Sequence, residues 1–142
     1  MSKDFVARAS VVINAPTASV WEALVKPEAV KQYMFGTDVV SNWKVGSSIV
    51  WRGEWHGSSF EDKGVILQFD AGHILQYSHF SALTGLPDEP GNYHTVTIEL
   101  SSEGQQTQVS LSQDGNPDEQ AREHSENNWT TMLTALKEYL EG

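Results

Sequence analysis

Residues 118–141, DEQAREHSENNWTTMLTALKEYLE, contain neither glycine nor proline and decide the fold that the sequence predicts. Apolar residues recur at helical spacing, which predicts one helix about 36 Å long at 1.5 Å per residue. The apolar stripe consists of Trp129, Met132, Leu133, Leu136 and Leu140, with Tyr139 beside it. Residues 118–128 are almost entirely polar, so only the second half of the helix is expected to pack in a dry core.

Most of the chain before this helix alternates between apolar and polar residues, as half-buried antiparallel strands do. Residues 5–13 form the first such segment, and strand follows strand from residue 37 to residue 114. The expected inward-facing sets are Val65, Leu67 and Phe69; Leu75, Tyr77 and His79; His94, Val96, Ile98 and Leu100; and Val109 and Leu111. The pattern predicts a meander of about six to seven strands.

Two short helices are expected between the first strand and the meander. Apolar residues recur at helical spacing from Val20 to Val25, where Pro27 interrupts the first helix. Pro27 can begin the second helix, which Gly36 ends. The sequence thus predicts an α+β fold over residues 1–142, taken as a single domain, in which a curved antiparallel sheet wraps around the long C-terminal helix.

The polar first half of the long helix also predicts a cavity. A wide sheet curled around a helix cannot fill its interior with side chains where that helix turns polar. We therefore expect a hollow near residues 118–128, and we seek function there.

The composition of the chain disfavours several classes of binding partner. Nineteen acidic and nine basic side chains give a formal charge of −10, which repels nucleic acid and anionic lipid surfaces. The chain has no cysteine, and no segment approaches the roughly 18 apolar residues that span a bilayer. We expect a cytoplasmic protein that binds no nucleic acid and inserts into no membrane.

The order of elements resembles the helix-grip fold of the START/Bet v 1-like (SRPBCC) superfamily. Residues 12–24, VINAPTASVWEAL, are similar to the opening signature of strand, Ala-Pro and first helix. Residues 43–47 (WKVGS), 64–66 (GVI) and 129–140 (WTTMLTALKEYL) follow in the expected order. Together these motifs resemble the branch of activator of Hsp90 ATPase homologue 1-like (AHSA1-like) proteins.

The resemblance implies a hydrophobic ligand in a cavity between the sheet and the C-terminal helix. It also implies two alternatives, a polyketide cyclase or dehydratase-like enzyme and a chaperone-interacting protein of the Hsp90 cochaperone kind. One departure concerns the pocket wall, because the family usually carries Trp-Phe or Trp-Trp where this chain has Tyr33-Met34-Phe35.

Nine residues are candidates for the cavity wall: Met34, Phe35, Trp51, Trp55, Tyr77, His79, His94, Ser125 and Asn128. Buried aromatics are also the commonest core filling, so the aromatic members fit an ordinary core equally well. His79 and His94 share parity with apolar residues and should point inward, where they could orient a ligand, move a proton or be satisfied by hydrogen bonds.

No motif predicts a metal site, a cofactor or a catalytic residue. Glu54, Glu61 and Asp62 are expected on a solvated polar turn, and the histidines lack the spacing of metal ligands. The leading hypothesis is a non-catalytic module that binds a small apolar or aromatic molecule. The enzyme and the chaperone-binding protein stay open beside it.

Overall fold

The computed structural model describes residues 5–55, 57–81 and 85–142, and for residues 55 and 58 it describes the backbone only. Within these residues the chain forms an antiparallel sheet, three α-helices and a short 3₁₀ helix, η2 (Pro90–Asn92). The strands are β1 (Phe5–Ile13), β2 (Asp38–Ser41), β3 (Ser48–Trp55), β4 (Ser58–Asp70), β5 (Ile74–Ser81), β6 (His94–Glu103) and β7 (Gln106–Asn116). The helices are α1 (Thr17–Val25), α2 (Pro27–Tyr33) and α3 (Glu119–Glu141).

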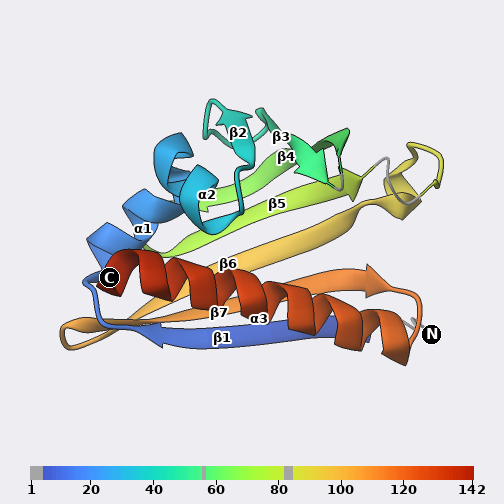
Figure 1. Cartoon of the computed structure of the whole chain (residues 1–142). Coiled ribbons are helices and arrows are strands. Elements are labelled where there is room, and N and C mark those ends of the chain that lie inside the picture. Colours follow the sequence, from blue (N-terminus) through green and yellow to red (C-terminus); the bar gives the residue numbers. More distant parts are fainter. Residues whose placement is uncertain (1–4, 56, 82–84) are drawn as a thin grey trace.

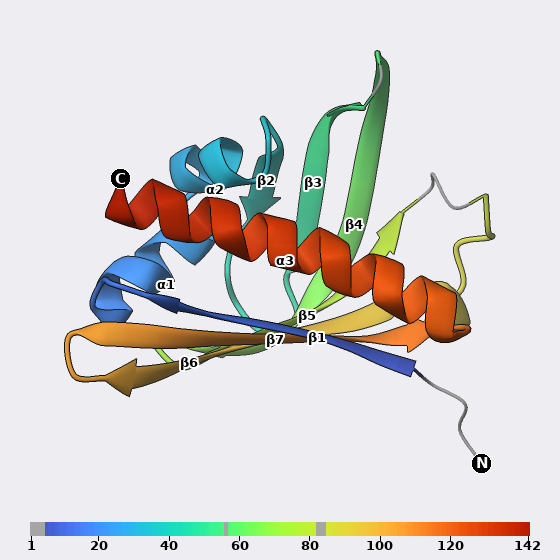
Figure 2. The same ribbon diagram turned by 60° about the horizontal axis from the view of Figure 1, so that its bottom comes forward.

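The seven strands form one curved sheet in the order β1-β7-β6-β5-β4-β3-β2. Figures 1 and 2 show that α3 crosses one face of this sheet and that the hairpin of β3 and β4 rises steeply from the plane of β1 and β7. Helices α1 and α2 lie at the C-terminal end of α3 (Figure 1). The predicted helix-grip architecture is confirmed, with the two short helices directly after the first strand.

The second half of α3 packs against the sheet with the predicted apolar stripe. Met132, Leu133 and Leu136 are buried in the same core cluster as the inward residues of the strands, and Trp129 packs against that cluster. Asp118 caps the start of the helix, because its side chain accepts a hydrogen bond of 2.8 Å from the backbone N–H of Ala121. Burial of apolar surface therefore fixes this half of the helix.

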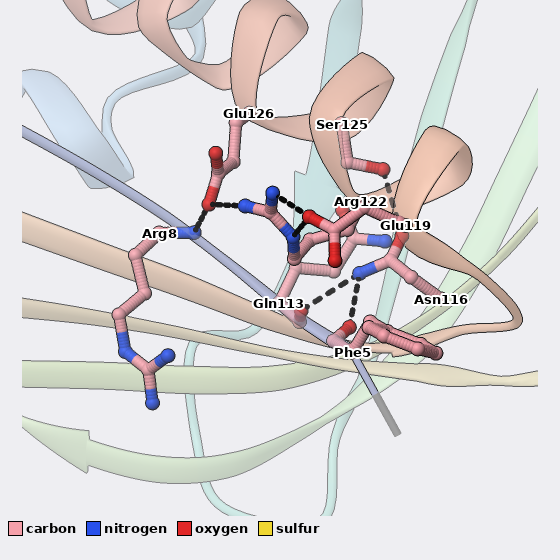
Figure 3. A network of polar contacts seen from close by, with 8 residues as sticks. All are labelled: Phe5, Arg8, Gln113, Asn116, Glu119, Arg122, Ser125 and Glu126. Carbon is pink, nitrogen blue, oxygen red and sulfur yellow. Dashed lines mark hydrogen bonds and ion pairs between the residues drawn. The ribbon is translucent and has the colours of Figure 1, made fainter. Parts of the chain in front are cut away.

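The first half of α3 is held by charge instead (Figure 3). The guanidinium of Arg122 pairs with Glu119 and, at 2.7 Å, with Glu126. Glu126 also accepts a hydrogen bond of 3.0 Å from the backbone N–H of Arg8 in β1. These contacts join the polar turns of the helix to the edge strand β1.

Asn116, at the end of β7, makes a second set of bonds beside the first (Figure 3). Its amide N–H group donates to the carbonyls of Phe5, at 2.8 Å, and Gln113, at 3.2 Å. Its Oδ1 accepts a bond of 2.9 Å from the Ser125 hydroxyl. One buried side chain thus connects β1, β7 and α3.

The expected inward set of β4 is wrong in part. Val65 and Leu67 are exposed, whereas Ile66 is fully buried and Phe69 packs against the core. The cause is a β-bulge between Ile66 and Gln68 where β4 pairs with β5. An extra residue there shifts the alternation by one position, so that Ile66 and Phe69 face the same side.

We predict that the contacts at the two ends of α3 make the fold acid-sensitive. The hydrogen bond from Arg8 and the Arg122 guanidinium lower the pKa of Glu126, and Lys137 with the backbone of Asn14 lowers the pKa of Glu141. A carboxylate whose pKa is lower in the folded state stabilises the fold above its unfolded pKa and loses that contribution as the pH falls through the folded value.

The double variant Glu126→Gln/Glu141→Gln should therefore have a lower Tm than the wild type at pH 7 and a smaller loss of Tm between pH 5 and pH 3. Thermal unfolding followed by circular dichroism measures both. Glu123→Gln, at an exposed position of the same helix, is the control and should leave the Tm profile unchanged. Parallel profiles for the double variant and the wild type would contradict this account.

Candidate functional site

A groove with a volume of about 530 Å³ opens beside the first half of α3. Its walls come from the end of β5, the segment of η2, the start of β6, the end of β7 and the first three turns of α3. These elements converge near the N-terminal end of α3 (Figure 2). The hollow therefore lies at the end of the helix where the sequence predicts one, and its volume is in the range of pockets that hold small molecules.

Two other hollows have comparable volumes but are more open. One, of about 710 Å³, lies over β1, β6 and β7 and is lined mainly by short polar side chains. The other, of about 520 Å³, lies between β4, the end of β5 and residues 86–88. Ligand sites combine apolar walls with polar groups that can contact the ligand. The first hollow has few apolar side chains, and in the second the charged groups Lys63 and Asp88 are paired with each other.

His79 forms part of the groove wall from β5. Its Nε2 lies 3.0 Å from Oδ2 of Asp62 on β4, and its ring meets that of Trp51 edge to face with centroids 5.0 Å apart. Because a carboxylate only accepts, the proton of the neutral imidazole is on Nε2. Asp62, expected on a solvated turn, is instead a strand residue whose side chain is 16% exposed.

His94 is the residue directly opposite His79 in the pairing of β5 with β6. Its Nδ1 lies 2.9 Å from the backbone carbonyl of Asp114, which accepts its N–H. Gly115 allows this approach, because a Cβ at that position would lie 2.7 Å from Nδ1 of His94. The two histidines are therefore held at neighbouring positions of one wall, each by one ring nitrogen.

Tyr93 supplies an aromatic wall next to His94. Its ring stacks on that of Phe80 with centroids 5.1 Å apart, and its hydroxyl donates to Asp88 over 2.6 Å. Asp88 also pairs with Lys63, which lowers the pKa of the carboxyl, while the bond to Asp88 raises the pKa of Tyr93. These bonds fix the Tyr93 ring against the sheet.

Trp129 closes the groove from α3. Its indole N–H donates to Oε1 of Gln113 on β7, over 2.5 Å. Ser125 lies one helical turn earlier in the same wall, and its hydroxyl is already used by Asn116. The helix side of the groove thus presents a large aromatic surface, two polar groups engaged with β7, and the side chain of His124.

The predicted wall residues do not form one site. His79, His94 and Ser125 line the groove. Met34, Trp51 and Tyr77 line a separate gap of about 30 Å³ between the sheet, α2 and α3, which has room for a water molecule and not for an organic ligand. Core side chains fill the part of the interior between the sheet and the second half of α3. Tyr77 is one of them, and its burial raises the pKa of its phenol.

Three predicted residues lie elsewhere. Phe35 is 71% exposed, because the chain turns through a φ of 56° directly after α2 and carries the ring outward. Asn128 lies on an exposed side of α3 and is not part of the groove wall. The side chain of Trp55 lies outside the described residues.

The sequence analysis does not predict several residues of the groove wall, namely Tyr93, Gln113, Asn116, His124 and Trp129. Trp129 fits the apolar stripe of α3 and is therefore assigned to the core. Gln113 follows the alternation of β7 and is buried with its apolar residues, whereas Asn116 is buried three residues later, beyond a shift in the register with β1. An amide at an inward strand position is the one signal that could have identified them, because buried polar groups require partners.

The described residues contain no cluster of three or more acidic or histidine side chains suited to a metal ion. In the same part of the chain, no helix has the length and apolarity that crossing a bilayer requires.

Comparison with known proteins places the chain among relatives. The family model described as activator of Hsp90 ATPase homolog 1-like protein matches residues 14–141. The solution structure of a protein from Cytophaga hutchinsonii is 58% identical, with a TM-score of 0.87 over 99% of this chain and 97% of that chain. A search of curated proteins finds no match.

More distant structures share the fold. The Aha1 dimer from Colwellia psychrerythraea is 17% identical, with a TM-score of 0.75 over 96% of both chains. DynU16, a protein in the dynemicin biosynthetic locus, is 19% identical, with a TM-score of 0.78 over 96% of this chain and 47% of that chain.

We predict that Gly115 is required for the position of His94. Gly115→Ala should destabilise the protein by about 2–4 kcal/mol, from a positive φ of 76° and from the contact of the new methyl group with His94. Gly104→Ala is the matched control, because φ is 67° there and a Cβ meets nothing within 4 Å. Its loss should be about 1–2 kcal/mol, from the backbone alone.

Urea unfolding measures both losses, and the ring resonances of His94 should move in Gly115→Ala only. Equal losses in the two variants, with His94 unmoved, would show that the close approach does not hold the ring.

Proposed function

The chain belongs to the family of activator of Hsp90 ATPase homolog 1-like proteins, and we propose that it binds a small, mostly aromatic or apolar molecule in the groove beside the first half of α3. The observation that carries the proposal is the composition of the groove wall. Aromatic surfaces from Tyr93 and Trp129 face polar groups that converge from β5, β6 and β7. Apolar burial would supply affinity, and the polar groups would supply orientation.

The wall side chains are already held in place by the protein, which favours ligand binding to a preformed groove. Tyr93, Trp129 and His94 are each held by a hydrogen bond to another part of the protein. Side chains fixed in this way lose little conformational freedom when a ligand arrives, so more of the burial energy remains as affinity. A non-catalytic binding role requires nothing further from the site.

An enzyme of the polyketide cyclase or dehydratase kind is the second candidate, and one observation favours it. The hydrogen bond between His79 and Asp62, 3.0 Å long, orients an imidazole at the groove wall as an acid or base would need. The family name suggests a third role, in which the protein contacts a chaperone. Native mass spectrometry of protein purified from its own host separates a bound small molecule from a bound chaperone chain.

We predict that Ala121→Trp blocks the groove. Ala121 lies in the groove wall on α3, and an indole there would occupy the space of a ligand. Binding of 2-naphthol, followed by amide chemical shifts, should weaken at least about tenfold, a loss of about 1.4 kcal/mol. Thr134→Trp, at an exposed position of the same helix, is the control and should bind as the wild type does. Unchanged binding in Ala121→Trp would remove the groove as the site.

For the enzyme candidate, the molecule recovered from the host is incubated with the protein and analysed by mass spectrometry. We expect it to be returned unchanged. Loss of water or ring closure that depends on wild-type protein and disappears in His79→Gln would establish the enzyme instead of the binding module.

A further inference from the structure

We propose that the paired histidines His79 and His94 make the groove selective for aromatic molecules that carry a hydroxyl group. The inference deepens the proposed function and rests on it, because it names the class of ligand for the same groove. It follows from which hydrogen-bonding groups of the wall are already used by the protein and which remain available.

Each histidine keeps one ring nitrogen for a ligand. Nε2 of His79 is bound to Asp62, which leaves Nδ1, and Nδ1 of His94 is bound to the carbonyl of Asp114, which leaves Nε2. Both partners accept, so each neutral ring carries its proton on the bound nitrogen and a lone pair on the other. The two remaining nitrogens are therefore hydrogen-bond acceptors.

These nitrogens also reach the groove surface. Among the described residues, the one buried side-chain nitrogen or oxygen without a partner is Oδ1 of Asp62. Since both histidines line the groove and neither is fully exposed, their second nitrogens are open to it and not enclosed by protein. Directly opposite residues on adjacent strands have Cβ atoms about 5 Å apart, so one ligand can reach both rings.

The donors of the wall, by contrast, are largely engaged. The indole N–H of Trp129 is used by Gln113, the hydroxyl of Ser125 by Asn116, and the hydroxyl of Tyr93 by Asp88. The amide N–H group of Asn116 donates to two backbone carbonyls. Apart from His124 and Gln113, the wall offers few partners to a ligand that has only acceptors, and such a ligand would leave the two histidine acceptors without a donor.

Gln113 completes the match to a hydroxyl. Its Oε1 must accept the Trp129 N–H, which assigns the other amide atom as Nε2, and this N–H group has no partner in the described residues. A hydroxyl both donates and accepts, so it can donate to a histidine and accept from Gln113. An ether oxygen can only accept, and a plain hydrocarbon does neither.

The test compares 2-naphthol with 2-methoxynaphthalene, which share one aromatic frame and differ in the hydrogen-bond donor. Amide shift titrations are run at pH 8, where the phenolic hydroxyl of 2-naphthol is still protonated. Wild-type protein should bind 2-naphthol at least about tenfold tighter, as one or two unreplaced hydrogen bonds predict. Shifts should centre on residues 79, 94 and 113.

His79→Phe and His94→Phe are the test variants, because phenylalanine keeps an aromatic ring and removes the nitrogen that accepts from the ligand. The preference for 2-naphthol should fall toward unity in both. His73→Phe is the matched control, since His73 is an exposed histidine bonded to Asp70 outside the groove, and it should keep the full preference.

A second measurement does not depend on any variant. Long-range proton–nitrogen spectra of the wild type should show the Nε2–H tautomer for His79 and the Nδ1–H tautomer for His94. The opposite tautomers, or equal binding of the two naphthalenes in the groove, would overturn the histidine selectivity and leave the binding role intact. Failure of both compounds to bind would overturn the selectivity and count against the proposed function as well.

Discussion

The docking of α3 across the sheet is the constraint on which the rest of the structure depends. Its second half is held by apolar burial, with Leu136 fully enclosed. Its first half is held by polar contacts, since Glu126 accepts from the backbone of β1 and Ser125 donates to the Asn116 amide of β7. Arg122 positions Glu126, and Asn116 is in turn bonded to the backbone of β1. The apolar half packs on the core, whereas the polar half is bonded to β1 and β7 and leaves a groove toward the ends of β5 and β6. The groove is the space that this difference leaves.

The same hydrogen bonds set the chemistry of the groove. The hydrogen bonds from Ser125 to Asn116 and from Trp129 to Gln113 attach the helix to β7. The same bonds make these two donors unavailable to a ligand. On the opposite wall, the bonds of His79 and His94 fix the strands' side chains and leave acceptors behind. The acceptor-rich character of the groove is thus a consequence of how the helix and the strands are held together.

The elements of this fold could be predicted from the sequence because they depend on local periodicity. Residues 118–141 indicate α3 to within one residue at its start, and the alternation of β6 and β7 places their buried residues correctly. The bulge in β4 could not be predicted, because it depends on the pairing with β5, and it reverses Val65 and Leu67. A strict alternation of apolar and polar residues does not show where a bulge adds a residue to one strand.

The site is harder to predict than the fold because its contacts join residues far apart in the sequence. His79 and His94 could be placed inward by parity, but their tautomers depend on Asp62 and on the Asp114 carbonyl, which only the folded sheet brings near. Phe35 shows the converse failure, since an aromatic residue beside a pocket motif points to solvent when its backbone turns left-handed. Residue type and spacing therefore locate a wall, whereas the groups that a wall offers to a ligand are decided by which of its hydrogen bonds the fold has already used.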